Sequence, residues 1–185
     1  VRDEQTGERT GETTAEPQYK DRTITGCAQP DLNLGWNNTL SYKNFSMTAF
    51  FTGVFGNDIY NSARANYTSP QMFSDGKNVL KEFIYERPAT DNLPNIPSDR
   101  FIEDGSYIRL KDLTIGYEFS GEWMKKIGMS RLQPYFSAQN LFTLTKYLGM
   151  DPEVNQYGNS GTVQGLDYGT YPQTRSFVLG VNIAF

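Results

Sequence analysis

Alternating carboxylate and amide side chains in one long loop are the first group of residues that could do chemistry. The segment "DPEVN" places Asp151, Glu153 and Asn155 two residues apart, and oxygen ligands at such spacing suit Ca²⁺. "SDGKN" offers the shorter set Asp75 and Asn78. Neither continues to the distal glutamate of an EF-hand. We therefore favour turns held by Asx hydrogen bonds over calcium sites, and we expect no metal and no cofactor.

Other catalytic arrangements find little support. The chain has no histidine and a single cysteine, Cys27, which removes His-based triads, imidazole metal ligands and an internal disulfide. Asp112 and Glu118 share the polar face of one predicted strand, but six residues of strand separate them by about 20 Å. That distance is too long for two carboxylates flanking one scissile bond. We expect a protein that is not an enzyme.

Four tyrosines in the second long loop are candidates for contact with a ligand. A phenol presents a flat apolar face with a polar tip, which can stack on a sugar ring or clamp a peptide. The alternative is that these rings pack the loop itself. The residues are Tyr147, Tyr157, Tyr168 and Tyr171.

Apolar residues alternate with polar ones along five stretches, which is the pattern of half-buried strands. The clearest is the terminal "SFVLGVNIAF", where Val178 alone interrupts the polar set. Its apolar row is Phe177, Leu179, Val181, Ile183 and Phe185. We predict strands over about 31–42, 45–55, 106–119, 131–145 and 173–185, with a short helical segment in "SGEWMKKIG".

A tight hairpin joins the first two predicted strands. "YKNF" reads as a two-residue turn with Lys43 and Asn44 at its tip, because Asn tolerates the positive φ of such turns. Counting outward places Trp36 opposite Phe51, with Leu40 opposite Met47 and Thr39 opposite Thr48. One stretch fits less well: Arg109 and Lys111 fall in phase with the apolar set, so this strand either stands clear of the apolar environment or contains a bulge.

The connections alternate between short and long. Residues 43–44 and 120–130 are short, whereas 56–104 and 146–172 are long. In an up-and-down arrangement all long connections emerge at one end, as in outer-membrane barrels with long extracellular loops and short periplasmic turns. The short-turn end would then carry an interfacial aromatic girdle, formed by Tyr42, Phe45, Tyr117, Phe119 and Phe185.

Composition sets further bounds. The net charge is −4, which offers no phosphate-tracking surface and argues against a nucleic-acid partner. The hydrophobic fraction is 37% while aromatic residues reach 14%, a balance that favours strands and aromatic belts. The longest apolar runs fall well short of the roughly 18 residues of a membrane helix.

Six ordered stretches resemble the C-terminal part of the SusC/RagA class of TonB-dependent outer-membrane transporters. They are "DRTITGCAQPDLNLGWNNTLSYKNF", "GNDIYN", "IEDGSYIRLKDLTIGYEF", "QNLFTLTKYLGMDPEVN", "GLDYGTYPQTRSF" and "GVNIAF". The resemblance implies an all-β, antiparallel transmembrane segment, about five strands of a 22-stranded barrel. Residues 1–30 would be an extracellular loop at the N-terminal end of a fragment, and 31–185 the C-terminal part of the barrel.

The same resemblance implies a function and partners. The whole protein would import oligosaccharides or peptides through the bacterial outer membrane with a SusD-like surface lipoprotein as lid. The remainder of the barrel and its plug, in the same protein or another chain, would complete it. An absent N-terminal part would contact the TonB complex. The terminal row that ends at Phe185 would face lipid and carry the signal read by the assembly machinery. The competing interpretation is a soluble β-sandwich that binds carbohydrate, whose apolar faces would pair across a core.

Overall fold

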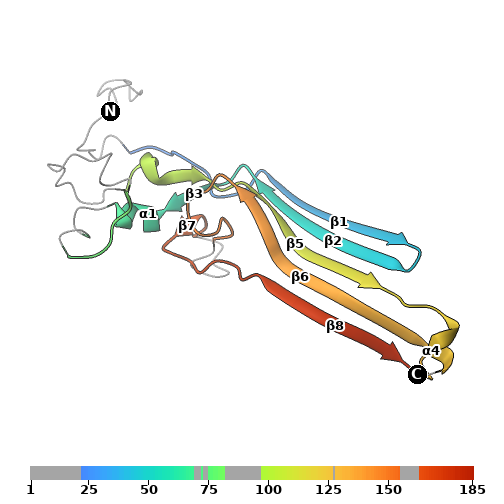
Figure 1. Cartoon of the computed structure of the whole chain (residues 1–185). Coiled ribbons are helices and arrows are strands. Elements are labelled where there is room, and N and C mark those ends of the chain that lie inside the picture. Colours follow the sequence, from blue (N-terminus) through green and yellow to red (C-terminus); the bar gives the residue numbers. More distant parts are fainter. Residues whose placement is uncertain (1–21, 69–71, 73–74, 82–96, 127, 155–162) are drawn as a thin grey trace.

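The computed structural model describes residues 22–68, 72, 75–81, 97–126, 128–154 and 163–185. A long twisted sheet occupies most of the molecule's length, and a smaller cap of short strands and one helix sits at one end (Figure 1). The C-terminus lies at the opposite end of the sheet. Within the described residues no helix is both long and apolar enough to cross a membrane.

Five antiparallel strands build the long sheet, in the order β1-β2-β5-β6-β8. Each strand lies within a stretch where the alternation predicts one. The order of the strands in the sheet follows their order in the chain. The two outer strands, β1 and β8, each have one edge without a partner among the described residues. The bounds are β1 Leu32–Tyr42, β2 Phe45–Phe55, β5 Tyr107–Tyr117, β6 Arg131–Thr145 and β8 Ser176–Ala184.

The β1–β2 hairpin confirms the predicted register. The positive φ of the turn falls on Lys43, at 53°, and not on Asn44, where the sequence predicts it. Trp36 lies opposite Phe51 and stacks on its ring at a centroid distance of 5.4 Å. Turn geometry and side-chain alternation therefore specify the same pairing.

Side chains of one character run in rows across the sheet. One row crosses all five strands with only apolar residues: Leu40, Met47, Ile115, Phe136 and Leu179. The adjacent row is polar except at its end: Thr39, Thr48, Thr114, Ser137 and Val178. Because successive residues of a strand point to opposite faces, the sheet has one apolar face and one polar face.

Two residues of the last strands depend on close backbone approach. The ring of Tyr135 lies over its cross-strand partner Gly180, where a Cβ atom would come within 2.3 Å of the ring. Pro134 sits where its missing N–H costs nothing. The carbonyl of Leu132 accepts a hydrogen bond from the N–H of Phe119, so the backbone of Leu132 faces β5. The backbone of Pro134, two residues further on, faces the same side. The last β5–β6 pair is at Gly116, so β5 has no carbonyl there that needs a donor from Pro134.

The cap forms from the two long connections that the sequence left as loops. Its three-stranded sheet has the order β4-β3-β7, with β3 and β7 parallel. Several buried apolar side chains lie in it, among them Ile59 and Phe101. The elements are β3 Asp58–Asn61, α1 Ser62–Tyr67, η2 Asp99–Phe101, β4 Ile102–Asp104 and β7 Leu166–Asp167.

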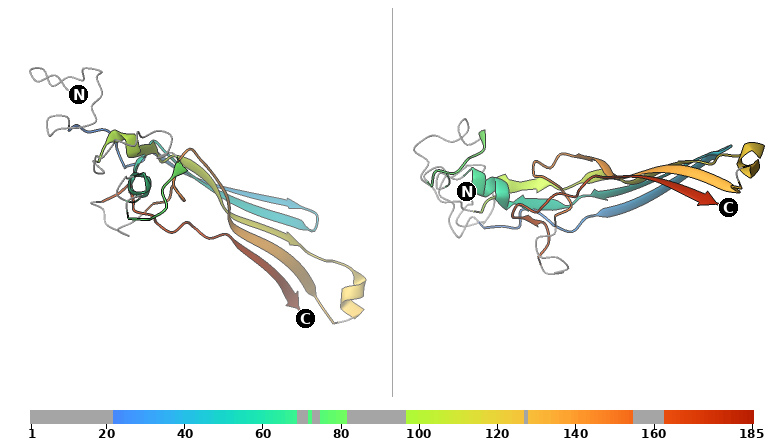
Figure 2. Two further views of the ribbon diagram at one scale, coloured as in Figure 1. Left: turned by 60° about the vertical axis from the view of Figure 1, so that its left-hand side comes forward. Right: turned by 60° about the horizontal axis from the view of Figure 1, so that its bottom comes forward.

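The long sheet forms a single layer. Viewed from a second direction, the strands run side by side with the cap at one end and nothing stacked on their length (Figure 2). Large apolar side chains on β1 and β8 are accordingly exposed. Among the described residues no second sheet covers the apolar face, which argues against a two-layer sandwich. At the far end the predicted helical segment is α4, Glu122–Lys126.

Candidate functional site

A bulge in β5 decides where Arg109 points. Asp112 pairs with Phe50 while Leu110 pairs with Phe51, so Lys111 is an extra residue relative to β2. The extra residue resets the alternation, and Arg109 lies on the polar face between Thr52 and Thr143. The misfit in the sequence pattern thus has the bulge as its cause.

Arg109 is the largest fully buried side chain of the described chain, at 1% exposure. Its guanidinium nitrogens donate to Asp151 at 2.6 Å and to Glu153 at 2.8 Å, and its Nε donates to Thr143 at 2.9 Å. Such charge-assisted bonds are about twice as strong as neutral ones. We call Arg109 with Asp151 and Glu153 the arginine clasp. It fastens the loop after β6 to the polar face of the sheet.

The clasp accounts for the alternating carboxylates of "DPEVN". Both Asp151 oxygens are occupied: one accepts from Arg109 and from the backbone N–H of Glu153, the other from the backbone N–H of Gln173. Asn155 lies outside the described residues. In the second segment, Asp75 pairs with Lys77 at 3.7 Å. Among the described residues no group of three or more His, Cys, Asp or Glu side chains is placed to hold a metal ion.

A second set of contacts ties the two long loops together. Tyr60 of β3 pairs with Leu166 of β7. Glu103 accepts hydrogen bonds from the Arg64 guanidinium at 3.1 Å and from the backbone N–H of Leu148 at 2.9 Å. The bond from Leu148 and the Tyr60–Leu166 pairing cross from the first long loop to the second, whereas the Arg64–Glu103 bond lies within the first. The described parts of both loops thus form one folded unit.

The four loop tyrosines occupy different environments. Tyr147 is 5% exposed, and its hydroxyl donates to Asp167 at 2.5 Å. Burial and this hydrogen bond raise the pKa of Tyr147 well above its ordinary value. Its ring packs the cap, whereas Tyr168 and Tyr171 are 53% and 82% exposed. Tyr157 lies outside the described residues.

The two carboxylates of the third predicted strand are not brought together. Asp112 lies within β5, opposite Gln139 of β6. Glu118 follows the end of β5 and pairs with Arg131 at 3.0 Å, with both side chains about half exposed. The geometry gives the pair no joint role.

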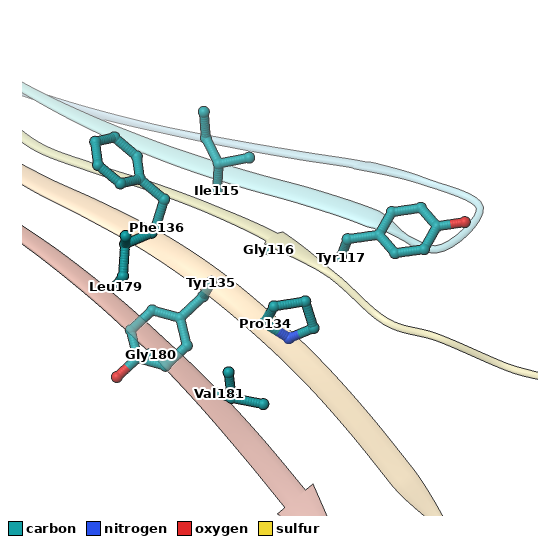
Figure 3. Close-up of a pocket in the computed structure, with 9 residues that line it drawn as sticks. All are labelled: Ile115, Gly116, Tyr117, Pro134, Tyr135, Phe136, Leu179, Gly180 and Val181. Atoms are coloured by element: carbon teal, nitrogen blue, oxygen red, sulfur yellow. The ribbon is translucent and has the colours of Figure 1, made fainter. Parts of the chain in front are cut away.

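The terminal strand presents its apolar row on the apolar face. Phe177, Leu179 and Val181 lie opposite Ala138, Phe136 and Pro134 of β6. All five residues of the row are at least half exposed, and Phe185 is the most exposed at 89%. Beside this row an open hollow of about 460 Å³ lies across β5, β6 and β8, with Pro134 and Tyr135 among its lining residues (Figure 3).

Aromatic residues gather at the short-turn end. Tyr117 packs edge-on against Phe119 at 5.0 Å, and Phe119 against Trp123 of α4 at 6.4 Å. Asn44 of the hairpin turn donates to the carbonyl of Glu118 at 2.6 Å, so the turn and the chain after β5 are joined. Trp123 is an addition to the aromatic set expected from sequence, because it comes from the connection and not from a strand.

A polar hollow of about 270 Å³ lies at the clasp. Arg109, Thr143 and Thr145 line it from the sheet, and the loop after β6 contributes further residues. The additional lining residues are Asn140, Met150, Asp151, Pro152, Pro172, Gln173 and Arg175. Sequence reasoning missed this site. The in-phase charges Arg109 and Lys111 indicated a bulge as one option, but not that Arg109 would meet the carboxylates of the loop after β6.

Comparison with known proteins gives one consistent family. No protein-family model matches the chain. The TonB-dependent receptor P3 of Formosa agariphila is 37% identical over 178 residues, which cover 89% of this chain and 17% of that receptor. The TonB-dependent receptor SusC of Bacteroides thetaiotaomicron is 29% identical over 84% of this chain and 15% of its own length.

Solved structures agree in fold. The RagAB peptide importer in its open-open state superposes with a TM-score of 0.73 at 23% identity, over 94% of this chain and 19% of that one. The RagAB peptide transporter gives the same TM-score over 93% of this chain. The chain thus spans less than a fifth of the length of each of these proteins. By sequence, the chain corresponds to one segment of the TonB-dependent receptors, SusC among them, and it shares the fold of one segment of RagAB.

Proposed function

We propose that the chain is the C-terminal barrel segment of an outer-membrane importer that depends on TonB. The observation that carries the proposal is the single-layer sheet with one apolar and one polar face, uncovered along its length in the described chain. An 11-residue strand is about 36 Å long. Tilted by about 45°, it spans about 25 Å, the height of the lipid-facing band of such barrels.

In this arrangement the apolar face contacts outer-membrane lipid and the polar face lines the lumen. The open edges of β1 and β8 pair with the remaining strands of a 22-stranded barrel that encloses a plug. The α4 end lies at the periplasmic side, with Tyr42, Tyr117, Phe119 and Trp123 at the interface between lipid and water. The cap is extracellular.

The whole protein transports its substrate without breaking a bond. The similarity to SusC and the RagAB likeness support a SusD-like surface lipoprotein as lid, and a peptide or an oligosaccharide as substrate. Energy is supplied through the TonB complex, which contacts a part of the receptor outside this chain. Tyr168 and Tyr171 expose their rings in the cap, where they are placed to stack on a substrate. Tyr147 and Tyr157 complete the candidate set, although the buried Tyr147 reaches a substrate only if the cap opens.

The test uses the full-length receptor in a Gram-negative host. We expect it in the outer-membrane fraction, released only by detergent, and migrating differently on gels before and after heating, as folded barrels do. Uptake of a short peptide or oligosaccharide should require both the receptor and an intact tonB gene. A full-length receptor that is water-soluble and monomeric without detergent contradicts the barrel proposal. Uptake that is unchanged without TonB contradicts the energy source.

A further inference from the structure

We propose that the polar hollow beside the arginine clasp binds a carboxylate group of the transported substrate. This inference rests on the proposed function, because it takes the polar face of the sheet as the lumen side. Arg109, Thr143 and Thr145 line the hollow from that face, while Pro152 and Pro172 line it from the loop after β6. A substrate that passes the mouth of the barrel would therefore meet the hollow.

The charge around the hollow is positive although the chain as a whole carries −4. Arg109 is neutralised by Asp151 and Glu153, which it contacts at 2.6 and 2.8 Å. Lys111 lies 3.8 Å from Glu153, so these two carboxylates already face two cations. Arg175 adds a third cation to the lining, and its guanidinium has no ion pair with any residue that the structure describes. The excess positive charge favours an anionic group in a partly enclosed site.

The clasp also keeps the hollow in shape. Asp151 holds the loop to the sheet through Arg109 and to Gln173 through its second oxygen, which accepts from the Gln173 backbone at 2.9 Å. Asn140 donates to the carbonyl of Thr174 at 2.9 Å. These bonds fix the backbone on both sides of the hollow, including the residue before Arg175. A site whose walls are fixed in advance loses less entropy when a ligand binds.

The lining also specifies what surrounds the carboxylate. Met150, Pro152 and Pro172 supply apolar surface, and Thr143 and Gln173 supply hydrogen-bonding groups. A planar carboxylate matches the donor fork of Arg175. Both a peptide with a free C-terminus and a glycan with a uronic acid carry this group next to a compact body. The shared chemistry is the carboxylate, and the experiment separates the two sources.

The experiment measures binding to the purified full-length receptor in detergent by calorimetry. One pair of probes is N-acetyl-tetraalanine with a free carboxylate and the same peptide as its amide; the other is digalacturonate and its neutral methyl ester. Arg175→Gln should weaken binding of a carboxylate probe about tenfold or more, as for one lost charge-assisted bond, and the neutral probe less than twofold. Arg175→Lys should keep most of the affinity. Whichever pair shows this difference identifies the source of the carboxylate.

The matched control is Arg131→Gln, which removes the same charge from the exposed pair with Glu118 at the other end of the sheet. It should leave all affinities unchanged. Equal affinity of wild type for the charged and neutral member of both pairs overturns the carboxylate site, as does an Arg175→Gln receptor that binds like wild type. Heat-dependent gel mobility reports barrel assembly separately, so failure of the proposed function is distinguished from failure of this site.

Discussion

At the scale of single residues, the clasp is unusual because it buries a guanidinium on the polar face of a sheet. Taking a charge out of water costs several kcal/mol, which only well-placed counter-charges and hydrogen bonds offset. Arg109 has both, with Asp151, Glu153 and Thr143 at 2.6 to 2.9 Å. Removal of one partner alone should therefore lower the free energy of unfolding strongly, since the other partner is left buried and charged.

Arg109→Met tests the clasp. We expect it to lower the free energy of unfolding of the full-length receptor by about 3–5 kcal/mol, because two carboxylates lose their buried partner. Proteases should also cut the loop after β6 faster. Asp151→Asn in the same background should recover part of the loss. The matched change Arg131→Met, at an exposed pair, should cost less than about 1 kcal/mol. Equal losses of unfolding free energy in Arg109→Met and Arg131→Met would show that the clasp stabilises the receptor no more than an exposed ion pair does.

Tyr147 gives a pH dependence. Its pKa is raised by burial and by the bond to Asp167, so its folded pKa exceeds its unfolded value of 10.0. The stability that it contributes is therefore fully present below about pH 10 and decreases as the pH rises above it. We expect protease resistance of the cap to be constant from pH 7 to 9 and to fall above pH 10. In Tyr147→Phe the fall above pH 10 should be smaller; an unchanged fall would assign it to other groups.

At the scale of elements, the bulge in β5 lets one strand keep a continuous apolar face and still aim Arg109 at the polar one. Deleting Lys111 alone leaves Leu110 and Asp112 adjacent on opposite faces, so Arg109 keeps its direction. Deleting Lys111 and Asp112 together turns Arg109 to the apolar face and Leu110 to the polar face. Loss of Lys111 alone thus leaves the side chain of Arg109 on the polar face. Loss of two residues moves it to the apolar face.

The deletions make this measurable. We expect the Lys111 deletion to assemble into the outer membrane at half the wild-type level or better, because it loses only the exposed 3.8 Å pair with Glu153. The double deletion should assemble at under a tenth, mainly because it removes the buried partner of Asp151 and Glu153, at about 3–5 kcal/mol. The guanidinium on the lipid face adds only about 0–1 kcal/mol, because Arg109 lies near the cap end of β5. Detergent-extracted receptor is quantified on gels without heating. Equal assembly of the two deletions would contradict the assignment of the bulge.

The same elements show how far the sequence reaches. The β1–β2 hairpin was predictable to the residue, because the turn at Lys43 and the alternation around Trp36 are both local signals. The bulge was one of two options, since no particular residue type marks the extra residue of a bulge, here Lys111. The cap was not predictable: the parallel pairing of Tyr60 with Leu166 joins segments far apart in the chain. Without the bulge and the cap, neither the clasp nor its hollow could be foreseen.

At the scale of the whole molecule, the proposed function makes the sheet one part of a larger assembly. Large buried apolar side chains such as Ile59 and Phe101 lie in the cap, whereas the apolar row of β8 is at least half exposed. Both edges of the sheet remain open in the described chain. In the proposed barrel, lipid and neighbouring strands supply what a soluble domain obtains from its own core.

Phe185→Ser probes the end of that assembly. Phe185 is 89% exposed at the end of the apolar row, and the proposed function has its ring contact lipid and the assembly machinery. We expect the amount of assembled barrel to fall several-fold, while uptake per assembled barrel stays within about twofold. Val178→Ser, on the opposite face of the same strand, is the matched control and should assemble normally. Unaltered assembly of Phe185→Ser would count against a role for the terminal ring.

The bulge also bears on how this segment tolerates insertions and deletions over evolution. Elsewhere in β5, the insertion or deletion of one residue moves every side chain on one side of the change to the opposite face of the sheet. At Lys111 a single residue can be lost without that effect. In aligned relatives, gaps of one residue should therefore gather at position 111, and gaps elsewhere in β5 should come in pairs.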